Sequence, residues 1–532
     1  MATGPSTKRF LAWAALSGIV SGAVFLALAE LVALLAARSA SPILAVGSFV
    51  IDIVPQPFKE FAIATFGEND KVALLAGLGL AVVIASALAG ILQLVRPPLG
   101  LVILGIAGAL ATAATLTRTG AEPLGFLPPV LGAVVACLVL VLLVRRLRAW
   151  RDATTATSAR RTQRTQAGEH VDAPRPGVDR RRFFVLAGVT SVAAVVVGIG
   201  ARTVTMATSS VEAIRRALRL PAPGATVAIP DGAELDVPGI SPLFTPNDDF
   251  YRVDTALTVP TIDPDSWTLV IDGMVDQRVE LTFRDLLDMG LDEYAITLTC
   301  VSNEVGGGLV GNAMWLGLPI RDVLAMAGPQ QGADMVLSTS VDGYTASTPL
   351  ASLTDEGLDA ILAVGMNGEP LPLEHGFPVR MVVPGLYGYV SATKWVTELK
   401  VTTFADDEAY WTPRGYSAEA PIKFSSRVDT PRVGTPVSAG TVPIAGMAWA
   451  QTVGIERVEV KIDDGEWQAA TLSNPVNDDT WVQWMLEWDA TPGTHYIACR
   501  AVNKAGETQI EERAPIAPNG SSGIQRPLIT VT

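Results

Sequence analysis

The chain contains few cysteines and few histidines, and their scarcity excludes several kinds of site. Its 532 residues include three cysteines, Cys137, Cys300 and Cys499, without CxxC or CxxCH spacing. This excludes a disulfide framework and argues against structural zinc, iron–sulfur clusters and covalently attached haem. The three histidines lie outside every long apolar run, so the membrane segments lack the axial ligands of a bis-histidine haem. We therefore expect no haem in this chain.

Charged residues are also scarce, and they are unevenly distributed. They make up 17% of the chain, against 49% hydrophobic residues and a mean hydropathy of +0.36, which is unusual for a soluble protein. Residues 1–205 contain 19 Lys and Arg and 10 Asp and Glu, a net charge of +9; residues 206–532 contain 20 and 43, a net charge of −23. Nucleic acid is excluded as a partner of the acidic part, because its phosphates require a basic surface.

Five apolar stretches are long enough to cross a bilayer, for which about 20 helical residues suffice. They are residues 10–36, 72–95, 99–116, 124–144 and 183–201. An apolar segment between the first two is broken by Asp52, Pro55 and Lys59, which favours an interfacial or re-entrant position. Basic residues flank the spans on one face. This predicts a multi-pass protein of the cell membrane whose residues after the fifth span lie outside the cytoplasm.

The membrane region is predicted to have three parts. Residues 1–150 form a four-span domain, residues 151–182 a disordered basic cytoplasmic linker, and residues 183–205 a fifth transmembrane helix. This helix begins with DRRRFFVLAGV, which is typical either of an internal twin-arginine export signal or of a plain basic flank. We expect it to be retained as an anchor, because no small-residue cleavage site is obvious after it.

The remainder of the chain predicts two further domains. Runs such as WTLVIDGMV and AITLTC alternate with helical patterns such as LPIRDVLAMAG, so residues 206–425 are predicted to form an α+β domain. Residues 426–532 contain short strands with hardly any helix, and the DDG that follows Ile462 is typical of a hairpin turn. This pattern predicts an immunoglobulin-like β-sandwich. Cys499 lies in one of its strands, where a packed side chain is the expected role.

Residues suited to chemistry cluster in the α+β domain. Cys300 ends the apolar strand AITLTC and precedes VSNEVGGG, where glycines allow a large ligand to approach the backbone. A buried cysteine before a flexible loop is the alternative. The loop fits neither GxGxxG nor the P-loop, which argues against a nucleotide fold. His375, Arg380 and Lys394 lie among Gly and Pro residues, which indicates either fixed loops around an anionic cofactor or solvated surface charge.

Several motifs resemble those of the sulfite oxidase family of molybdenum–molybdopterin oxidoreductases, and they occur in that family's order. They are FYRVDT, LTCVSNEVGG with GNAMW, NGEPLPLEHGFPVR, PGLYGYVSATKW and YWTPRGY, within residues 245–532. The resemblance implies an α+β molybdopterin-binding domain and a C-terminal immunoglobulin-like dimerisation domain. A homodimer is therefore expected.

The resemblance also implies roles for individual residues. Cys300 supplies a thiolate ligand to molybdenum, a soft metal centre that suits sulfur. Arg252 lies near the reacting centre and binds an oxyanion, Tyr416 hydrogen-bonds the substrate, and Trp315 forms an aromatic pocket wall. The residues implied to bind the pterin and its phosphate are Asn247, Tyr251, Arg252, Asp342, His375, Arg380, Thr393 and Lys394.

The implied reaction is two-electron oxygen-atom transfer. Sulfite or a related small sulfur compound is the first candidate substrate, and electrons pass to a separate cytochrome-like partner. Vertebrate sulfite oxidases have an arginine pair where this chain has Glu304 and Val305. The loss of positive charge keeps a sulfoxide or N-oxide reductase open as the alternative. An exported adhesion or assembly module, suggested by the sandwich alone, is the non-enzymatic alternative.

Overall fold

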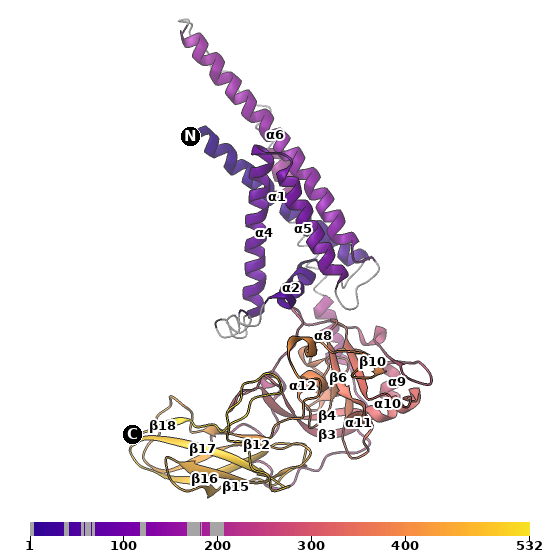
Figure 1. The fold of residues 1–532 in the computed structure, drawn as a ribbon, viewed down its shortest axis with the longest axis vertical. Helices are drawn as coiled ribbons and strands as arrows, with labels where there is room; N and C mark the ends of the chain where they lie inside the picture. Colours follow the sequence, from indigo (N-terminus) through magenta and orange to yellow (C-terminus); the bar gives the residue numbers. More distant parts are fainter. Residues whose placement is uncertain are drawn as a thin grey trace. The chain divides into compact units, whose positions relative to one another are not determined.

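The computed structural model describes residues 5–36, 42–54, 58, 65, 70–117, 124–166, 181, 184–191 and 207–532 (Figure 1). The chain forms two compact units. One is Met1–Thr208 with Ala256–Thr258, and the other is Ser209–Thr255 with Val259–Thr532.

The first unit is helical. Its helices are α1 (Pro5–Ala36), α2 (Pro42–Ile53), α4 (Asp70–Val95), α5 (Leu99–Leu116) and α6 (Leu127–Gln166). Four of these helices, α1, α4, α5 and α6, are long and apolar enough to cross a membrane, and they agree with the first four predicted spans. Helix α2 has 12 residues, which is about 18 Å and too short to span a bilayer.

The predicted fifth span and the predicted linker are described only in part. Residues 184–191 are helical, and the rest of the span lies outside the described residues. The prediction of a disordered linker from residue 151 is wrong as far as Gln166, because α6 continues to that residue without interruption. No Gly or Pro interrupts residues 151–166, and Thr154 and Thr155 donate their hydroxyls to carbonyls one turn earlier. The remainder of the linker lies outside the described residues.

Small residues let α1 and α4 approach each other very closely. A Cβ atom placed on Gly18 of α1 would lie 1.8 Å from the carbonyl oxygen of Ser86, and one placed on Gly90 of α4 would lie 1.9 Å from that of Ala14. Small residues at such contacts let two helix backbones pack closely. This is typical of membrane helices, whose association is driven by packing rather than by exclusion of water.

We expect Gly90→Leu to force α1 and α4 apart, because its side chain would overlap the backbone at Ala14. Overpacking costs about 1–3 kcal/mol. The temperature at which half of the full-length protein in detergent disappears from its size-exclusion peak should therefore fall. The matched control is Gly79→Leu on the same helix, where no atom lies within 4 Å of the added Cβ. Equal temperatures for the two variants would contradict the packing assigned to Gly90.

The second unit begins with two mixed layers of strands and short helices. One sheet has the order β2-β1-β10-β5-β6, and the other β3-β4-β7-β8 with β9 paired to β7. The strands of the first sheet are β1 (Thr268–Gly273), β2 (Val279–Thr282), β5 (Met335–Ser340), β6 (Thr345–Pro349) and β10 (Val396–Thr402). Those of the second are β3 (Asp292–Thr299), β4 (Val310–Pro319), β7 (Ile361–Met366), β8 (Glu369–Pro370) and β9 (Arg380–Val382).

Short helices cover these sheets and connect their strands. The α-helices are α8 (Ala207–Ala217), α9 (Phe283–Asp288), α10 (Ile320–Ala327), α11 (Leu350–Thr354) and α12 (Gly388–Ser391). The 3₁₀ helices are η2 (Asn247–Asp249), η3 (Pro264–Ser266), η4 (Leu373–His375) and η5 (Thr412–Arg414). This is the α+β arrangement that the sequence predicts.

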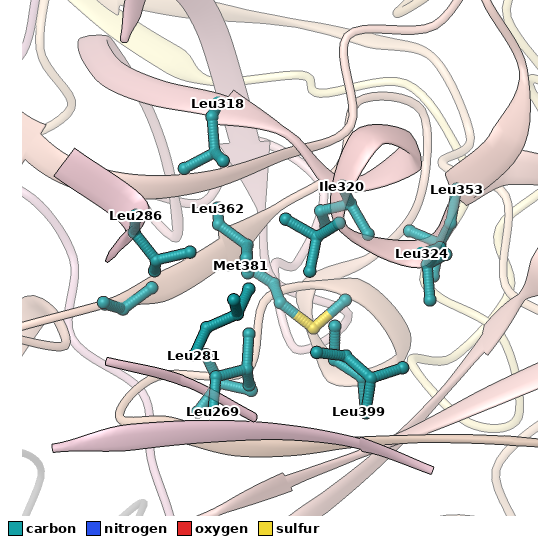
Figure 2. Packing of buried hydrophobic residues seen from close by; sticks show 14 of the residues in the cluster. Leu269, Leu281, Leu286, Leu318, Ile320, Leu324, Leu353, Leu362, Met381 and Leu399 are labelled. Carbon is teal, nitrogen blue, oxygen red and sulfur yellow. The ribbon is translucent and has the colours of Figure 1, made fainter. Parts of the chain in front are cut away.

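One apolar core joins both sheets to the helices. Figure 2 shows the Met381 side chain of β9 in the middle of this cluster, with Leu399 of β10 and Ile320 of α10 around it. All three side chains are fully buried. The core holds the strand ends and loops of both sheets in fixed positions, which is what a site built from distant segments requires.

The C-terminal part is a sandwich of two four-stranded sheets. Their orders are β11-β12-β16-β15 and β14-β13-β17-β18. The strands are β11 (Ser425–Thr430), β12 (Gly440–Trp449), β13 (Ile455–Ile462), β14 (Gln468–Ala469), β15 (Thr471–Leu472), β16 (Val482–Ala490), β17 (Gly493–Asn503) and β18 (Leu528–Val531). The hairpin predicted after Ile462 is confirmed, since β13 and β14 pair in antiparallel fashion. Trp484 and Cys499 lie fully buried in the shared core, in agreement with a packing role for this cysteine.

Candidate active site

A cavity of about 140 Å³ lies in the second unit, where loops of both mixed sheets meet. Its walls come from residues 250–255, the end of β3, the turn between β5 and β6, β9, and the loops around α12 and η5. The residues predicted from the sequence that line it are Tyr251, Cys300, Asp342, His375, Arg380, Lys394 and Tyr416. The fold therefore brings together residues that lie up to 165 positions apart in the sequence.

The Cys300 thiol lies at the end of β3 and faces the cavity. Its Sγ atom accepts a hydrogen bond from the backbone N–H of Ser302 at 3.4 Å. Burial raises the pKa of this thiol, whereas the Ser302 N–H and the nearby Lys394 ammonium lower it. The site thus shields Cys300 from water and also supplies groups that stabilise a thiolate.

The Arg380 guanidinium is buried and is surrounded by backbone carbonyls. It donates to the carbonyl oxygens of His375, Met381 and Ala392 at 3.1, 3.3 and 3.5 Å. Among the residues that the structure describes, no carboxylate forms an ion pair with it. Burial lowers the pKa of Arg380 to about 10. A buried cation with only neutral acceptors is suited to bind an anion in the cavity.

Two cations share one carboxylate beside Arg380. Lys394 Nζ donates to Asp254 Oδ2 at 2.7 Å, and Arg252 Nε donates to the same oxygen at 2.9 Å. Burial lowers the pKa of Lys394 to about 8, although Asp254 opposes the shift. The predicted residue Arg252 does not line the cavity, and its side chain is 38% exposed. Sequence reasoning missed Asp254, whose position two residues after Arg252 in FYRVDT was the available signal.

His375 is held as a neutral hydrogen-bonding group. Its Nε2 lies 3.1 Å from the backbone oxygen of Asn247, and only 3% of its surface is exposed. Burial and the Arg380 charge lower the pKa of His375 to about 3, so the ring is uncharged near neutral pH. The Asn247 side chain, predicted to bind the cofactor, instead contacts Glu369 at 2.8 Å and Asn367 at 2.8 Å and does not line the cavity.

Two further predicted residues lie behind the wall of the cavity. The Thr393 hydroxyl bonds the Ser338 hydroxyl at 2.7 Å. Trp315 is fully buried, donates its indole N–H to the carbonyl of Ile296 at 3.0 Å, and lies under the Arg380 guanidinium at 5.1 Å. The pocket wall predicted for Trp315 is therefore wrong for this structure, because its strand directs the ring into the core. Its contact is with Arg380 instead.

Aromatic rings form a further part of the cavity lining. The Tyr416 ring lies 5.1 Å from Trp411 and 5.6 Å from Tyr389, and all three line the cavity. The Tyr389 hydroxyl donates to the carbonyl of Ser417 at 2.7 Å, and the Tyr344 hydroxyl to that of Tyr389 at 2.7 Å. Trp411, Tyr389 and Tyr344 were not predicted as site residues, although the first two lie within motifs that carried the resemblance.

The loop after Cys300 does not direct Glu304 or Val305 into the cavity. Glu304 is exposed, and Val305 lies against the position where Gly523 would carry a Cβ atom, at 3.5 Å. Ser302 is the residue of this loop that lines the cavity beyond Val301. These two positions therefore contribute no charge to the cavity lining, and Val305 lies against the C-terminal domain instead.

Comparison with known proteins identifies the family. The model for the oxidoreductase molybdopterin binding domain matches residues 256–411. Sulfite oxidase of Gallus gallus is 30% identical over 320 residues, which cover 51% of this chain and 69% of that protein. The chain belongs to the sulfite oxidase family. Its residues 256–411 accordingly contain an oxidoreductase molybdopterin binding domain.

Two further proteins align with about half of the chain. Mitochondrial sulfite oxidase of Homo sapiens is 32% identical over 322 residues, which cover 51% of this chain and 58% of that protein. The chain thus spans little more than half the length of this relative. The solved sulfane dehydrogenase SoxCD of Paracoccus pantotrophus aligns with a TM-score of 0.48 and 23% identity, over 55% of this chain and 84% of that one.

The cavity of this sulfite oxidase family member suits the molybdenum cofactor that the family implies. Its donor set combines the Cys300 thiol with the Arg380 guanidinium, which has only carbonyl partners among the described residues. The buried Ser340 hydroxyl, which also lines the cavity, has no hydrogen-bond partner within the described part of the chain. A soft metal ligand and unmet donors for an anion are what a molybdenum–pterin phosphate requires.

We expect Arg380→Gln to lower the molybdenum and pterin content of purified full-length protein at least fivefold. The glutamine keeps the hydrogen-bonding ability of the side chain but removes the buried charge that attracts the anion. Metal analysis and pterin fluorescence measure the loss. The control is Arg278→Gln, which removes an exposed arginine paired with Glu280 and should retain the wild-type content. Wild-type content in Arg380→Gln would show that this guanidinium does not hold the cofactor.

Proposed function

We propose that this protein is a membrane-anchored molybdenum enzyme that oxidises sulfite or a related small sulfur compound by two-electron oxygen-atom transfer. The observation that carries the proposal is the cavity in which the Cys300 thiol and the Arg380 guanidinium face the same space. The substrate class is carried over from relatives named sulfite oxidase.

The molybdenum cofactor, when bound, supplies the oxygen-atom transfer and takes up the two electrons. Cys300 would hold the metal as a thiolate, for which the Ser302 N–H donates a hydrogen bond. Arg380 and Lys394 would attract the anionic parts of the cofactor, and neutral His375 would offer a hydrogen bond without adding charge. Tyr251 and Asp342, which line the cavity, would bind the pterin. Asn247 would hold His375 through its backbone oxygen, and Thr393 would support the site from behind through Ser338.

The aromatic side of the cavity would receive the substrate. Tyr416 offers a phenolic hydroxyl, and Trp411 and Tyr389 beside it exclude water from the reacting centre. Exclusion of water strengthens every electrostatic interaction inside the site. Arg252, held by Asp254 at 2.9 Å, would attract an oxyanion toward the entrance.

A sulfoxide or N-oxide reductase is the alternative, and the charge of the cavity favours it. The charged residues that line the cavity are two cations, Arg380 and Lys394, and two carboxylates, Asp254 and Asp342. An anionic cofactor would make this balanced set negative overall. Together with the aromatic wall, a negative site favours a neutral organic oxide over a doubly charged anion.

The rest of the chain would anchor and export the catalytic part. The four apolar helices would cross the cell membrane, and residues 183–205 would form a fifth, retained span with a twin-arginine-like start. Residues 206–425 would be the catalytic domain, outside the cytoplasm, and residues 426–532 an immunoglobulin-like domain through which two chains dimerise. The net charge of −23 after residue 205 favours a basic, cytochrome-like electron acceptor.

We expect the wild-type protein in detergent to reduce ferricyanide when sulfite is added, and Cys300→Ser to reduce it at least a hundredfold more slowly. The substitution replaces the thiolate with a hydroxyl that is a poor ligand for a soft metal. The matched control is Cys137→Ser on α6, which should keep wild-type turnover. Unimpaired turnover in Cys300→Ser would contradict the proposal. Sulfite-inactive protein that consumes reduced viologen with a sulfoxide or N-oxide would establish the alternative.

A further inference from the structure

The connection between β17 and β18 contains a segment, residues 516–523, that contacts three residues close in sequence to the lining of the active-site cavity. We call it the clamp segment. It belongs to the C-terminal sandwich by sequence, yet its partners Asn303, Ser417 and Tyr387 all belong to the catalytic domain. None of the clamp residues lines the cavity itself.

The first contact reaches the loop that follows Cys300. The Ser521 hydroxyl donates to the backbone oxygen of Asn303 at 2.7 Å. Asn303 closes a turn on the cysteine, because its N–H donates to the Cys300 carbonyl at 3.0 Å. The Asn303 side chain also accepts from the N–H of Leu309 at 2.8 Å. Ser521 is therefore connected to Cys300 through a single residue, Asn303.

The second contact reaches the aromatic wall. The backbone N–H of Ser417, next to Tyr416, donates to the carbonyl of Pro518 at 3.0 Å. The carbonyl of the same Ser417 accepts from the Tyr389 hydroxyl at 2.7 Å. A single residue held by the clamp segment thus connects to both Tyr416 and Tyr389, which line the cavity.

The third contact fixes the start of α12. Gly520 has a φ of +92° and lies so close to Tyr387 that a Cβ atom would be 2.4 Å from the phenolic oxygen. Tyr387 immediately precedes Gly388 and Tyr389, which line the cavity. The Lys423 ammonium of the catalytic domain binds the same part of the clamp segment. It donates to the Gly520 carbonyl at 2.6 Å and to Asn519 Oδ1 at 3.1 Å.

We propose that the clamp segment positions the Cys300 loop against the Tyr389 and Tyr416 wall, and that Ser521 is a positioning residue for the thiol. This proposal goes beyond the proposed function, because it gives the C-terminal domain a role in positioning the active site from outside the cavity. A segment bonded to both the Cys300 loop and the residue after Tyr416 sets the distance between them, and displacements of about 1 Å at a reacting centre are costly for rate.

Two adjacent serines provide a matched test. Ser521 donates its hydroxyl to Asn303 of the catalytic domain, whereas Ser522 donates its hydroxyl to Glu512 within the same connection at 2.8 Å. Ser521→Ala and Ser522→Ala therefore each remove one hydroxyl bonded to a carbonyl, but only the first removes a bond to the Cys300 loop.

The first readout needs no turnover. Full-length protein made without molybdenum is treated with iodoacetamide, and the alkylation rate of the Cys300 peptide is followed by mass spectrometry. We expect Ser521→Ala to raise this rate threefold to tenfold, because a partly buried hydrogen bond to the Cys300 loop is lost, and Ser522→Ala to leave it unchanged. Equal rates for both variants and the wild type would overturn the proposal.

The second readout uses the loaded enzyme and rests on the proposed function. Ser521→Ala should lower kcat for sulfite threefold to tenfold, change KM by less than twofold, and keep the wild-type molybdenum content and unfolding temperature. Gly520→Ala should lower kcat further by displacing Tyr387. If the alkylation rates separate the two serine variants while no sulfite turnover occurs, the clamp stands and the proposed substrate fails. Where the wild-type enzyme turns over sulfite, identical kinetics for both serine variants would contradict the clamp.

Discussion

A buried positive charge without a carboxylate partner is the constraint around which the site is arranged. Arg380 is almost fully buried, and its partners in the described chain are three backbone carbonyls. Taking a guanidinium out of water is unfavourable unless a counter-charge completes the site. The rest of the cavity supports this group: the Trp315 ring lies beneath it, and His375 stays neutral beside it. An anionic cofactor would satisfy the charge that the fold leaves unmatched.

Nearby charges are distributed so that the cavity does not become strongly cationic. Asp254 binds both Lys394 and Arg252, which leaves Arg380 as the lining cation without an ion pair among the described residues. Asp342 adds a second carboxylate to the lining. In the proposed function this balance separates two tasks, because the buried guanidinium would bind the cofactor while Tyr389, Trp411 and Tyr416 would receive the substrate.

The sequence motifs predicted much of the site because they lie at fixed strand ends and loops. Cys300, His375, Arg380, Lys394 and Tyr416 all line the cavity as expected. Side-chain direction was the part that spacing could not determine. Trp315 lies behind Arg380. Val305 lies against the C-terminal domain, because the loop after Cys300 packs against residues 516–523. Contacts of that kind depend on segments more than 200 residues apart.

At the level of the fold, long apolar runs and alternating patterns predicted the helices and the two strand-rich domains. The extension of α6 to Gln166 was missed because threonine and arginine suggested a solvated linker, whereas the absence of Gly and Pro allows the helix to continue. Asp254 was missed for a different reason: one acidic residue in an acidic domain carries no signal until the fold places it between Lys394 and Arg252.

X-ray absorption at the molybdenum edge of the purified full-length protein tests the central claim most directly, which is that Cys300 binds molybdenum in this cavity. The account predicts one molybdenum per chain in the wild type. It also predicts that each molybdenum in Cys300→Ser has one sulfur ligand fewer than in the wild type. An unchanged number of sulfur ligands in the variant, or correctly folded wild-type protein without molybdenum, would contradict it.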